Sequence, residues 1–178
     1  QMWMYKNNVV DLDDSIENGS VVDILTTKKE YIGTGFISKQ SHVLVRILTK
    51  NPSEVINREF FKKRIQFAYD FRKTVEYDNI TNCRLIFGEA DSLPGLTVDR
   101  YNDILVCQIS SYGLDMRKDM IYECLLEVLR EDREIADITE AKVLVSGGVT
   151  RGVCVVDDKD FLTKVVETGG LQLKSVYF

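Results

Sequence analysis

The sequence predicts an α+β protein in which a small β-barrel precedes a compact unit of strands and two helices. Short runs rich in Val, Ile and Leu fill most of residues 20–49, as expected for strands. Two later segments carry apolar residues three or four positions apart, the spacing of amphipathic helices. At 178 residues and 44% hydrophobic content, the chain is long enough for one domain or two small ones with a real core.

Three strands are expected in the first fifty residues, over 20–26, 31–38 and 41–49. The segments between them are short enough for hairpin turns. Gly33 and Gly35 interrupt the second strand, where missing side chains indicate a bulge or a close approach of two backbones. Small barrels need such positions.

A helix is expected over about 57–75, with Asn57 as its N-cap. Its predicted core-facing residues are Phe61, Ile65, Ala68, Phe71 and Val75. A strand over 83–87 and a hairpin of 96–100 with 104–110 follow. Asp115 is the predicted cap of a second helix that ends near Arg130, and its expected apolar stripe is Ile121, Cys124, Leu125, Val128 and Leu129.

Short elements are predicted in the last forty residues: strands near 142–145, 153–156 and 171–178, and a helix over 159–166. These pieces are too short and too closely joined to form a domain of their own.

Charge is unevenly distributed along the chain, whose net charge is −5. Residues 46–73 hold eight basic and three acidic side chains, whereas residues 119–140 hold eight acidic and two basic ones. Such asymmetry suits a protein that offers one face to a polyanion. Ordinary solvated helix faces are the alternative explanation.

Several function classes are disfavoured. No stretch of about 18 apolar residues occurs and the N-terminus lacks a signal-peptide layout, so we expect a cytoplasmic protein with no membrane partner. The four cysteines form no C-x-x-C pair, which removes zinc and thioredoxin-type sites. His42 is the only histidine, so a catalytic triad or multi-histidine metal site has little to build on.

The most specific stretch of the sequence runs from Arg84 to Tyr101 and reads R-L-I-F-G-E-A-D-S-L-P-G-L-T-V-D-R-Y. It resembles the E-A-D-x-L-P-G-L-x-V-D-x-Y signature of a family of S-adenosylmethionine-dependent methyltransferases that modify cytosine in large-subunit ribosomal RNA. Two weaker matches precede it in the family's order. W-M-Y-K-N at residues 3–7 resembles the family's opening, and residues 31–48 resemble a G-x-G and V-R-x-L pattern of its PUA domain.

The resemblance implies three parts: a PUA-like RNA-binding barrel over 1–52, an intermediate α+β domain over 53–134, and a fragmentary piece of a Rossmann-like α/β methyltransferase domain over 135–178. The family's G-Q-K-T-G, D-x-F-x-x-x-G and D-P-P motifs are absent here. Because D-K-D-F-L at 158–162 and L-K-S-V-Y-F at 173–178 resemble later family segments, we hypothesise an enzyme whose catalytic middle is missing from this sequence. A naturally shortened protein is the competing account.

The function implied is methylation of cytosine C5 in large-subunit ribosomal RNA, with this chain supplying mainly RNA recognition. S-adenosylmethionine is the implied cofactor, with no cofactor-binding residue identified, and ribosomal RNA is the implied partner. A homodimer is a candidate assembly. Two alternatives stay open: a non-catalytic RNA-binding module, and a small interaction domain with no nucleic-acid role.

Candidate site residues rest partly on this resemblance and partly on residue type, and a solvent-facing charge is the alternative for each basic one. Family enzymes attack cytosine C6 with a cysteine thiolate, and Cys154 is the candidate nucleophile, with a buried structural cysteine as its alternative. Cys83, Cys107 and Cys124 are expected to be core thiols. Stacking on a base is expected of Trp3 or Tyr5, and phosphate contact of Lys6, Arg46, Lys62, Lys63 and Arg72. For Glu89, Asp91 and Asp99 a structural role is favoured over acid–base chemistry.

Overall fold

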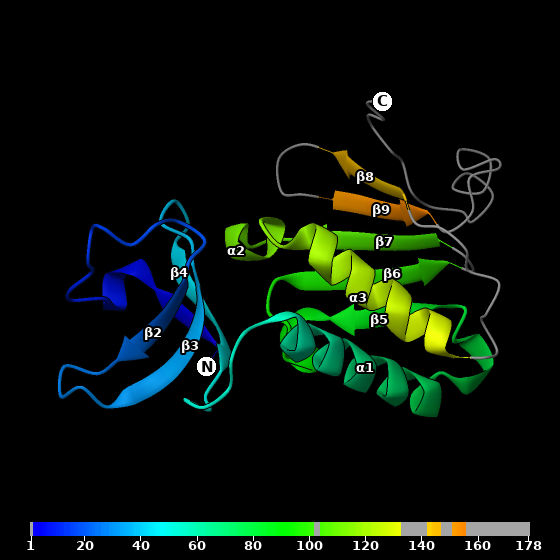
Figure 1. The fold of residues 1–178 in the computed structure, drawn as a ribbon, viewed down its shortest axis with the longest axis horizontal. Coiled ribbons are helices and arrows are strands. Elements are labelled where there is room, and N and C mark those ends of the chain that lie inside the picture. The colour runs from blue at the N-terminus through cyan, green and yellow to red at the C-terminus, as the bar shows by residue number, and fades with distance from the viewer. Residues whose placement is uncertain (1, 102–103, 133–141, 147–150, 156–178) are drawn as a thin grey trace.

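The computed structural model describes residues 2–101, 104–132, 142–146 and 151–155. Its N-terminal part, blue to cyan in Figure 1, is a four-stranded antiparallel sheet in the order β1-β4-β3-β2, here called sheet A. The strands are β1 (Trp3–Tyr5), β2 (Val21–Leu25), β3 (Tyr31–Ile37) and β4 (Val43–Thr49), and a 3₁₀ turn, η1 (Lys6–Asn8), follows β1. The three predicted strands are confirmed.

The two glycines predicted to allow a close backbone approach do so. A Cβ on Gly35 would lie 2.0 Å from the carbonyl oxygen of Arg46, and the pairing of β3 with β4 shifts register between Thr34 and Gly35. The predicted barrel closure differs from what is observed: among the described residues no strand pair joins β1 to β2, so sheet A is open. One side of the sheet lines a hollow of about 620 Å³ with the side chains of Met4, Ile37 and Val45.

The second part is a five-stranded antiparallel sheet in the order β5-β6-β7-β9-β8, with helices α1 and α3 side by side in front of it (Figure 1). Its elements are α1 (Arg58–Val75), η2 (Tyr77–Asn79), β5 (Asn82–Phe87), η3 (Gly88–Asp91), β6 (Leu96–Tyr101), β7 (Ile104–Ile109), α2 (Tyr112–Asp115), α3 (Lys118–Glu131), β8 (Lys142–Ser146) and β9 (Arg151–Val155). Leu96 and Val98 on β6 are buried while Thr97 and Asp99 are only half-buried, the alternation of a sheet covered on one face. The backbones of β8 and β9 extend this sheet beyond β7. The division of the chain at residue 135 stays a prediction.

Helix α1 begins where the sequence predicts. The Asn57 side chain accepts a hydrogen bond from the backbone N–H of Phe60 at 3.0 Å, so Asn57 is the N-cap. The predicted stripe is correct for Phe61, Ile65 and Ala68, which are buried. It is wrong for Phe71 and Val75, which are 55% and 53% exposed. The buried face of α1 turns instead through Tyr69 and Arg72, because the last turns of α1 pack beside β5.

Helix α3 starts two residues later than expected. Asp115 ends the short helix α2, and Arg117 takes the position before the first residue of α3. Asp115 instead pairs with Lys118, one turn along, at 3.3 Å. The predicted stripe of α3 is confirmed, since its five apolar residues are all buried.

One cross-strand row of sheet A faces the second part of the molecule. Antiparallel register places Trp3 opposite Arg46, and Arg46 opposite Phe36. Side chains of paired residues project from the same face of a sheet, so the three form a row. Phe36 stacks on Phe61 of α1, with ring centroids 6.4 Å apart, and thereby joins the main core. A Cβ on Gly113 of α2 would lie 2.4 Å from Phe36, so close packing at this junction requires glycine there.

Within the described residues, no helix combines the length and apolar character needed to cross a lipid bilayer.

Candidate nucleic-acid interface

The signature segment forms a tight turn whose acidic residues hold the structure together. Asp91 accepts hydrogen bonds from the backbone N–H of Phe87 at 2.6 Å and from Nη2 of Arg72 at 2.7 Å. Asp99 on β6 accepts from Arg84 on β5 at 2.7 and 3.1 Å. The structural role favoured for these carboxylates is therefore what the structure shows, since each is bonded to a neighbouring part of the fold.

Glu89 of the same turn reaches sheet A. Its Oε1 accepts a hydrogen bond from the indole N–H of Trp3 at 2.7 Å, across 86 positions of sequence. Arg46, the cross-strand partner of Trp3, is half-buried and lies over Gly95, where an added Cβ would come within 3.3 Å of Arg46 Cδ. The signature turn thus contacts both Trp3 and Arg46.

Trp3 and Tyr5 remain accessible beside this contact. The two residues are 39% and 37% exposed, and their rings meet edge to face, with ring centroids 6.3 Å apart and an interplanar angle of 82°. Lys6 follows directly and is exposed. The structure therefore brings together Trp3, Tyr5, Lys6 and Arg46, four of the predicted RNA-contacting residues, and we call them the edge cluster.

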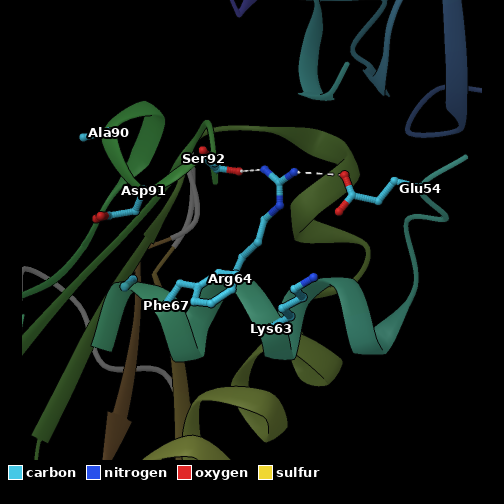
Figure 2. Close-up of a pocket in the computed structure, with 8 residues that line it drawn as sticks. Glu54, Lys63, Arg64, Phe67, Ala90, Asp91 and Ser92 are labelled. Carbon is cyan, nitrogen blue, oxygen red and sulfur yellow. Dashed lines mark hydrogen bonds and ion pairs between the residues drawn. The ribbon is translucent and has the colours of Figure 1, made fainter. Parts of the chain in front are cut away.

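The other side of the signature turn borders a cleft of about 360 Å³ against helix α1, shown in Figure 2. Arg64 bridges the cleft, donating to the carbonyl oxygen of Ser92 at 2.5 Å and to Glu54 at 3.2 Å. Lys63 and Phe67 line the cleft from α1, with the ammonium of Lys63 5.7 Å from the Phe67 ring centroid. The cleft pairs one exposed cation with an exposed aromatic side chain.

Two predicted contact residues on α1 are engaged elsewhere. Arg72 is 9% exposed, donates to the backbone oxygen of Arg84 at 2.7 Å and pairs with Asp91, so its guanidinium faces the interior. We leave Arg72 out of the proposed interface for that reason. Lys62 pairs with Glu131 of α3 at 2.8 Å and with Glu127 at 3.4 Å. Much of the basic face of α1 thus neutralises the acidic face of α3.

Burial changes the electrostatics of the two arginines beside the turn. Desolvation lowers the pKa of Arg46, and the negative charge of Glu89 opposes that change. Desolvation likewise lowers the pKa of Arg64, opposed by Glu54. Both remain charged at neutral pH, because guanidinium groups in proteins stay protonated.

The described residues offer no site that fits S-adenosylmethionine. Cofactors of this kind bind where a glycine-rich loop joins a strand to a helix in a parallel sheet, and every described strand pair is antiparallel. Cys154 lies on β9, with its backbone between Leu105 of β7 and Val143 of β8. No group of three or more metal-ligating side chains is present in the described part of the chain. Cys107 and Cys124 are buried and Cys83 is half-buried, as expected for core thiols.

Sequence reasoning missed Glu89, Arg64 and Phe67 as members of this surface. Glu89 and Trp3 are 86 positions apart, and no local spacing links them. Arg64 and Phe67 could have been predicted, because residues 60–67 read F-F-K-K-R-I-Q-F, with basic residues between aromatic ones. That composition is typical of surfaces on which bases stack.

Comparison with known proteins agrees with the motif resemblance. A family model described as a PUA-like domain matches residues 1–50. The chain is 36% identical over 126 residues to ribosomal RNA large subunit methyltransferase I of Aliivibrio fischeri, covering 70% of this chain and 32% of that protein. It is 29% identical over 174 residues to the protein of the same name from Aeromonas hydrophila, covering 96% of this chain and 44% of that protein. The chain therefore spans 32% and 44% of the lengths of these two relatives, and its resemblance to them is confirmed.

Solved structures share the fold. A Streptococcus mutans protein described as an S-adenosylmethionine-dependent methyltransferase superposes with a TM-score of 0.60 at 18% identity, over 88% of this chain and 44% of that one. The crystal structure of SMU.776, described as a methyltransferase complexed with SAH, gives a TM-score of 0.62 at 18% identity over the same shares. The mixed α+β architecture is thus one found in such proteins.

Proposed function

We propose that this chain is the RNA-recognition part of an S-adenosylmethionine-dependent ribosomal RNA methyltransferase. The observation that carries the proposal is the edge cluster, which sits on the segment matched as a PUA-like domain and exposes two aromatic rings beside two cations. The names of the relatives and the shared fold support the enzyme class. Aromatic rings and cations together suit RNA, because rings stack on bases and cations neutralise phosphates.

Cytosine C5 as the methylated atom is a finer proposal, supported by the signature turn alone. We assign the cofactor no site on the described residues, because none fits it. Cys154 stays the proposed nucleophile, and its position in the sequence is the sole support for that role. Its backbone is paired on both sides within a sheet, whereas catalytic residues are found disproportionately on loops, which favours the structural alternative.

The proposal is tested by binding of fluorescently labelled large-subunit ribosomal RNA fragments to the 178-residue chain. A double variant, Lys6→Glu with Lys63→Glu, removes one cation from each side of the signature turn. The matched control, Lys28→Glu with Lys29→Glu, makes the same change of charge in the β2–β3 hairpin turn. We expect anisotropy titrations to show at least a tenfold loss of affinity for the first variant and little change for the second.

Equal losses for both variants would mean attraction to net charge without a defined surface, and would contradict the assignment. Calorimetric titration of the same chain with S-adenosylmethionine separates recognition from catalysis. We expect no heat of binding, because none of the described residues forms a cofactor cradle. Tight binding would show that the chain carries the catalytic part as well.

A further inference from the structure

We propose that Trp3 and Tyr5 form a stacking platform for an unpaired RNA base, and that Glu89 is the residue that positions this platform. The inference rests on the proposed function and deepens it, because it specifies a single-stranded feature of the RNA as the ligand of the edge cluster.

The two rings are placed as a platform requires. Trp3 and Tyr5 are two positions apart on β1, so their side chains leave the same face of the strand. β1 is an edge strand of sheet A, and a ligand can therefore lie beside it without displacing another strand. The edge-to-face arrangement leaves more than a third of each residue accessible. Large aromatic side chains gain free energy when buried, so two exposed neighbours indicate a surface that meets a ligand.

The hydrogen bond to Glu89 determines what Trp3 can do. An indole has one polar hydrogen, and that of Trp3 is donated to the Glu89 carboxylate, with 2.7 Å between Nε1 and Oε1. The ring can then stack on a base but has no donor left to read the base edge, so recognition by Trp3 is tolerant of sequence. The bond also fixes the orientation of the ring before RNA arrives, which lowers the entropy lost on binding.

The charges around the platform select a polyanion. Lys6 is exposed directly after Tyr5, and its backbone N–H donates to the carbonyl oxygen of His42 at 3.0 Å, which holds β1 against the start of β4. Arg46 is the cross-strand partner of Trp3. The carboxylate of Glu89 offsets part of the Arg46 charge, and Lys6 supplies a second cation next to the rings. Such cations suit the phosphates that flank a stacked base. A peptide ligand would gain nothing from them unless it were acidic.

The chain is suited to a direct test, because Trp3 is its only tryptophan. Intrinsic fluorescence of the 178-residue chain therefore reports on the platform itself. We expect a single-stranded RNA oligonucleotide to quench this emission saturably, as base stacking on indole does. A duplex of the same length should bind through its phosphates with much weaker quenching, because its bases are already stacked.

Variants separate the platform from a purely structural contact. Trp3→Ala and Tyr5→Ala should each weaken single-strand binding roughly 5- to 150-fold, the range for loss of one stacked base. Glu89→Ala should weaken binding and shift the Trp3 emission, whereas Glu89→Gln, which keeps an acceptor oxygen, should restore both. Phe71→Ala is the control, since it removes an exposed aromatic side chain from α1, outside the edge cluster. Circular dichroism checks that each variant is folded.

Three results would overturn the inference, and they can be told apart. If RNA binds but Trp3 emission is unchanged and Trp3→Ala binds within twofold of the parent, the platform is wrong while the proposed function stands. If no RNA binds the parent chain by anisotropy, the proposed function fails and the platform fails with it. Equal quenching by single strand and duplex would also contradict the unpaired base as ligand.

Discussion

At the scale of single residues, two aspartates of the signature segment illustrate how burial decides the value of an ion pair. The side chains of Asp91 and Arg72 are 9% and 11% exposed, and Asp91 also accepts a hydrogen bond from the backbone N–H of Phe87. Asp99 and Arg84 make a similar pair at 2.7 Å, but their side chains are 25% and 47% exposed. Water screens the second pair far more than the first.

Replacing each aspartate by alanine should therefore give unequal results. Asp91→Ala leaves the buried Arg72 guanidinium without its carboxylate and should lower the free energy of unfolding by about 3 kcal/mol or more. Asp99→Ala should cost less than about 1 kcal/mol. Urea unfolding followed by circular dichroism measures both. Equal costs would contradict the assignment of Asp91 as the residue that anchors the turn.

At the scale of secondary structure, helix α1 has three faces with different tasks. Phe61 is fully buried between Phe36 and Phe60. A second face pairs with α3 through Arg58 and Lys62. The third face leaves Phe67, Phe71 and Val75 exposed, and Phe67 also lines the cleft beside the signature turn.

Two phenylalanines of α1 separate the buried from the exposed face. Phe61→Ala should lower the free energy of unfolding by about 3–5 kcal/mol, because it opens a cavity between the two parts of the molecule. Phe71→Ala should change it by less than about 0.5 kcal/mol, as expected for an exposed side chain. The same urea titrations measure both, and a large cost for Phe71→Ala would mean that its face is covered.

The ion pairs between α1 and α3 make stability depend on pH. The hydrogen bond from Arg58 is the main cause that lowers the pKa of Glu127 below its ordinary value of 4.5, and Lys62 adds to it. A carboxyl with a depressed pKa in the folded state stabilises the fold above its unfolded pKa, and this contribution is lost as pH falls through the folded pKa.

Glu127→Gln should therefore be less stable than the parent near neutral pH, and the difference should shrink once the pH falls below 4.5. Urea midpoints measured across the acid range test this. Glu123→Gln on the exposed face of α3 is the control, and it should show a much smaller effect. A difference for Glu127→Gln that stays constant into strong acid would show that the carboxylate charge is not its source.

At the scale of the whole molecule, one row of side chains is a main contact between sheet A and the second part. Trp3 bonds to Glu89, Arg46 packs over Gly95, and Phe36 enters the main core. Arg117 adds to this junction by donating to the carbonyl oxygen of Gly19 at 3.0 Å, with its guanidinium 4.3 Å from the Phe36 ring centroid. The two parts should therefore unfold together.

Phe36→Ala tests this coupling, because Phe36 is a large aromatic side chain that sheet A contributes to the main core, together with Leu48. We expect the single unfolding transition of the parent to split in two, with sheet A melting first. Differential scanning calorimetry shows this directly. A single transition displaced to lower temperature would instead mean that Arg117 and Glu89 suffice to couple the parts.

Local signals in the sequence predict the elements well but not how they meet. Asn57 and the alternation in residues 96–101 fix a helix start and a strand, because caps and periodicity act over a few residues. Phe71 was placed in the core by its spacing, but the position of β5 decides which face of α1 is covered. The contact of Glu89 with Trp3 depends on two sheets docking, which no local spacing encodes.

The edge cluster likewise combines residues that the sequence predicts with contacts that only the tertiary structure shows. Trp3, Tyr5, Lys6 and Arg46 could be proposed from the sequence because they fall in segments that resemble the PUA domain. Arg72 could not be excluded, since its burial depends on Asp91 in a distant turn. Residue types identify candidates for RNA contact, and only tertiary contacts show which cations are already paired.

The most direct test of RNA recognition is the salt dependence of binding by the 178-residue chain to a large-subunit ribosomal RNA fragment, measured between about 50 and 200 mM salt. We expect a linear fall of log affinity with log salt, with a slope of roughly −1 to −3, because each neutralised phosphate of a single strand contributes about −0.7. A slope near zero, or no binding at the lowest salt, would contradict it.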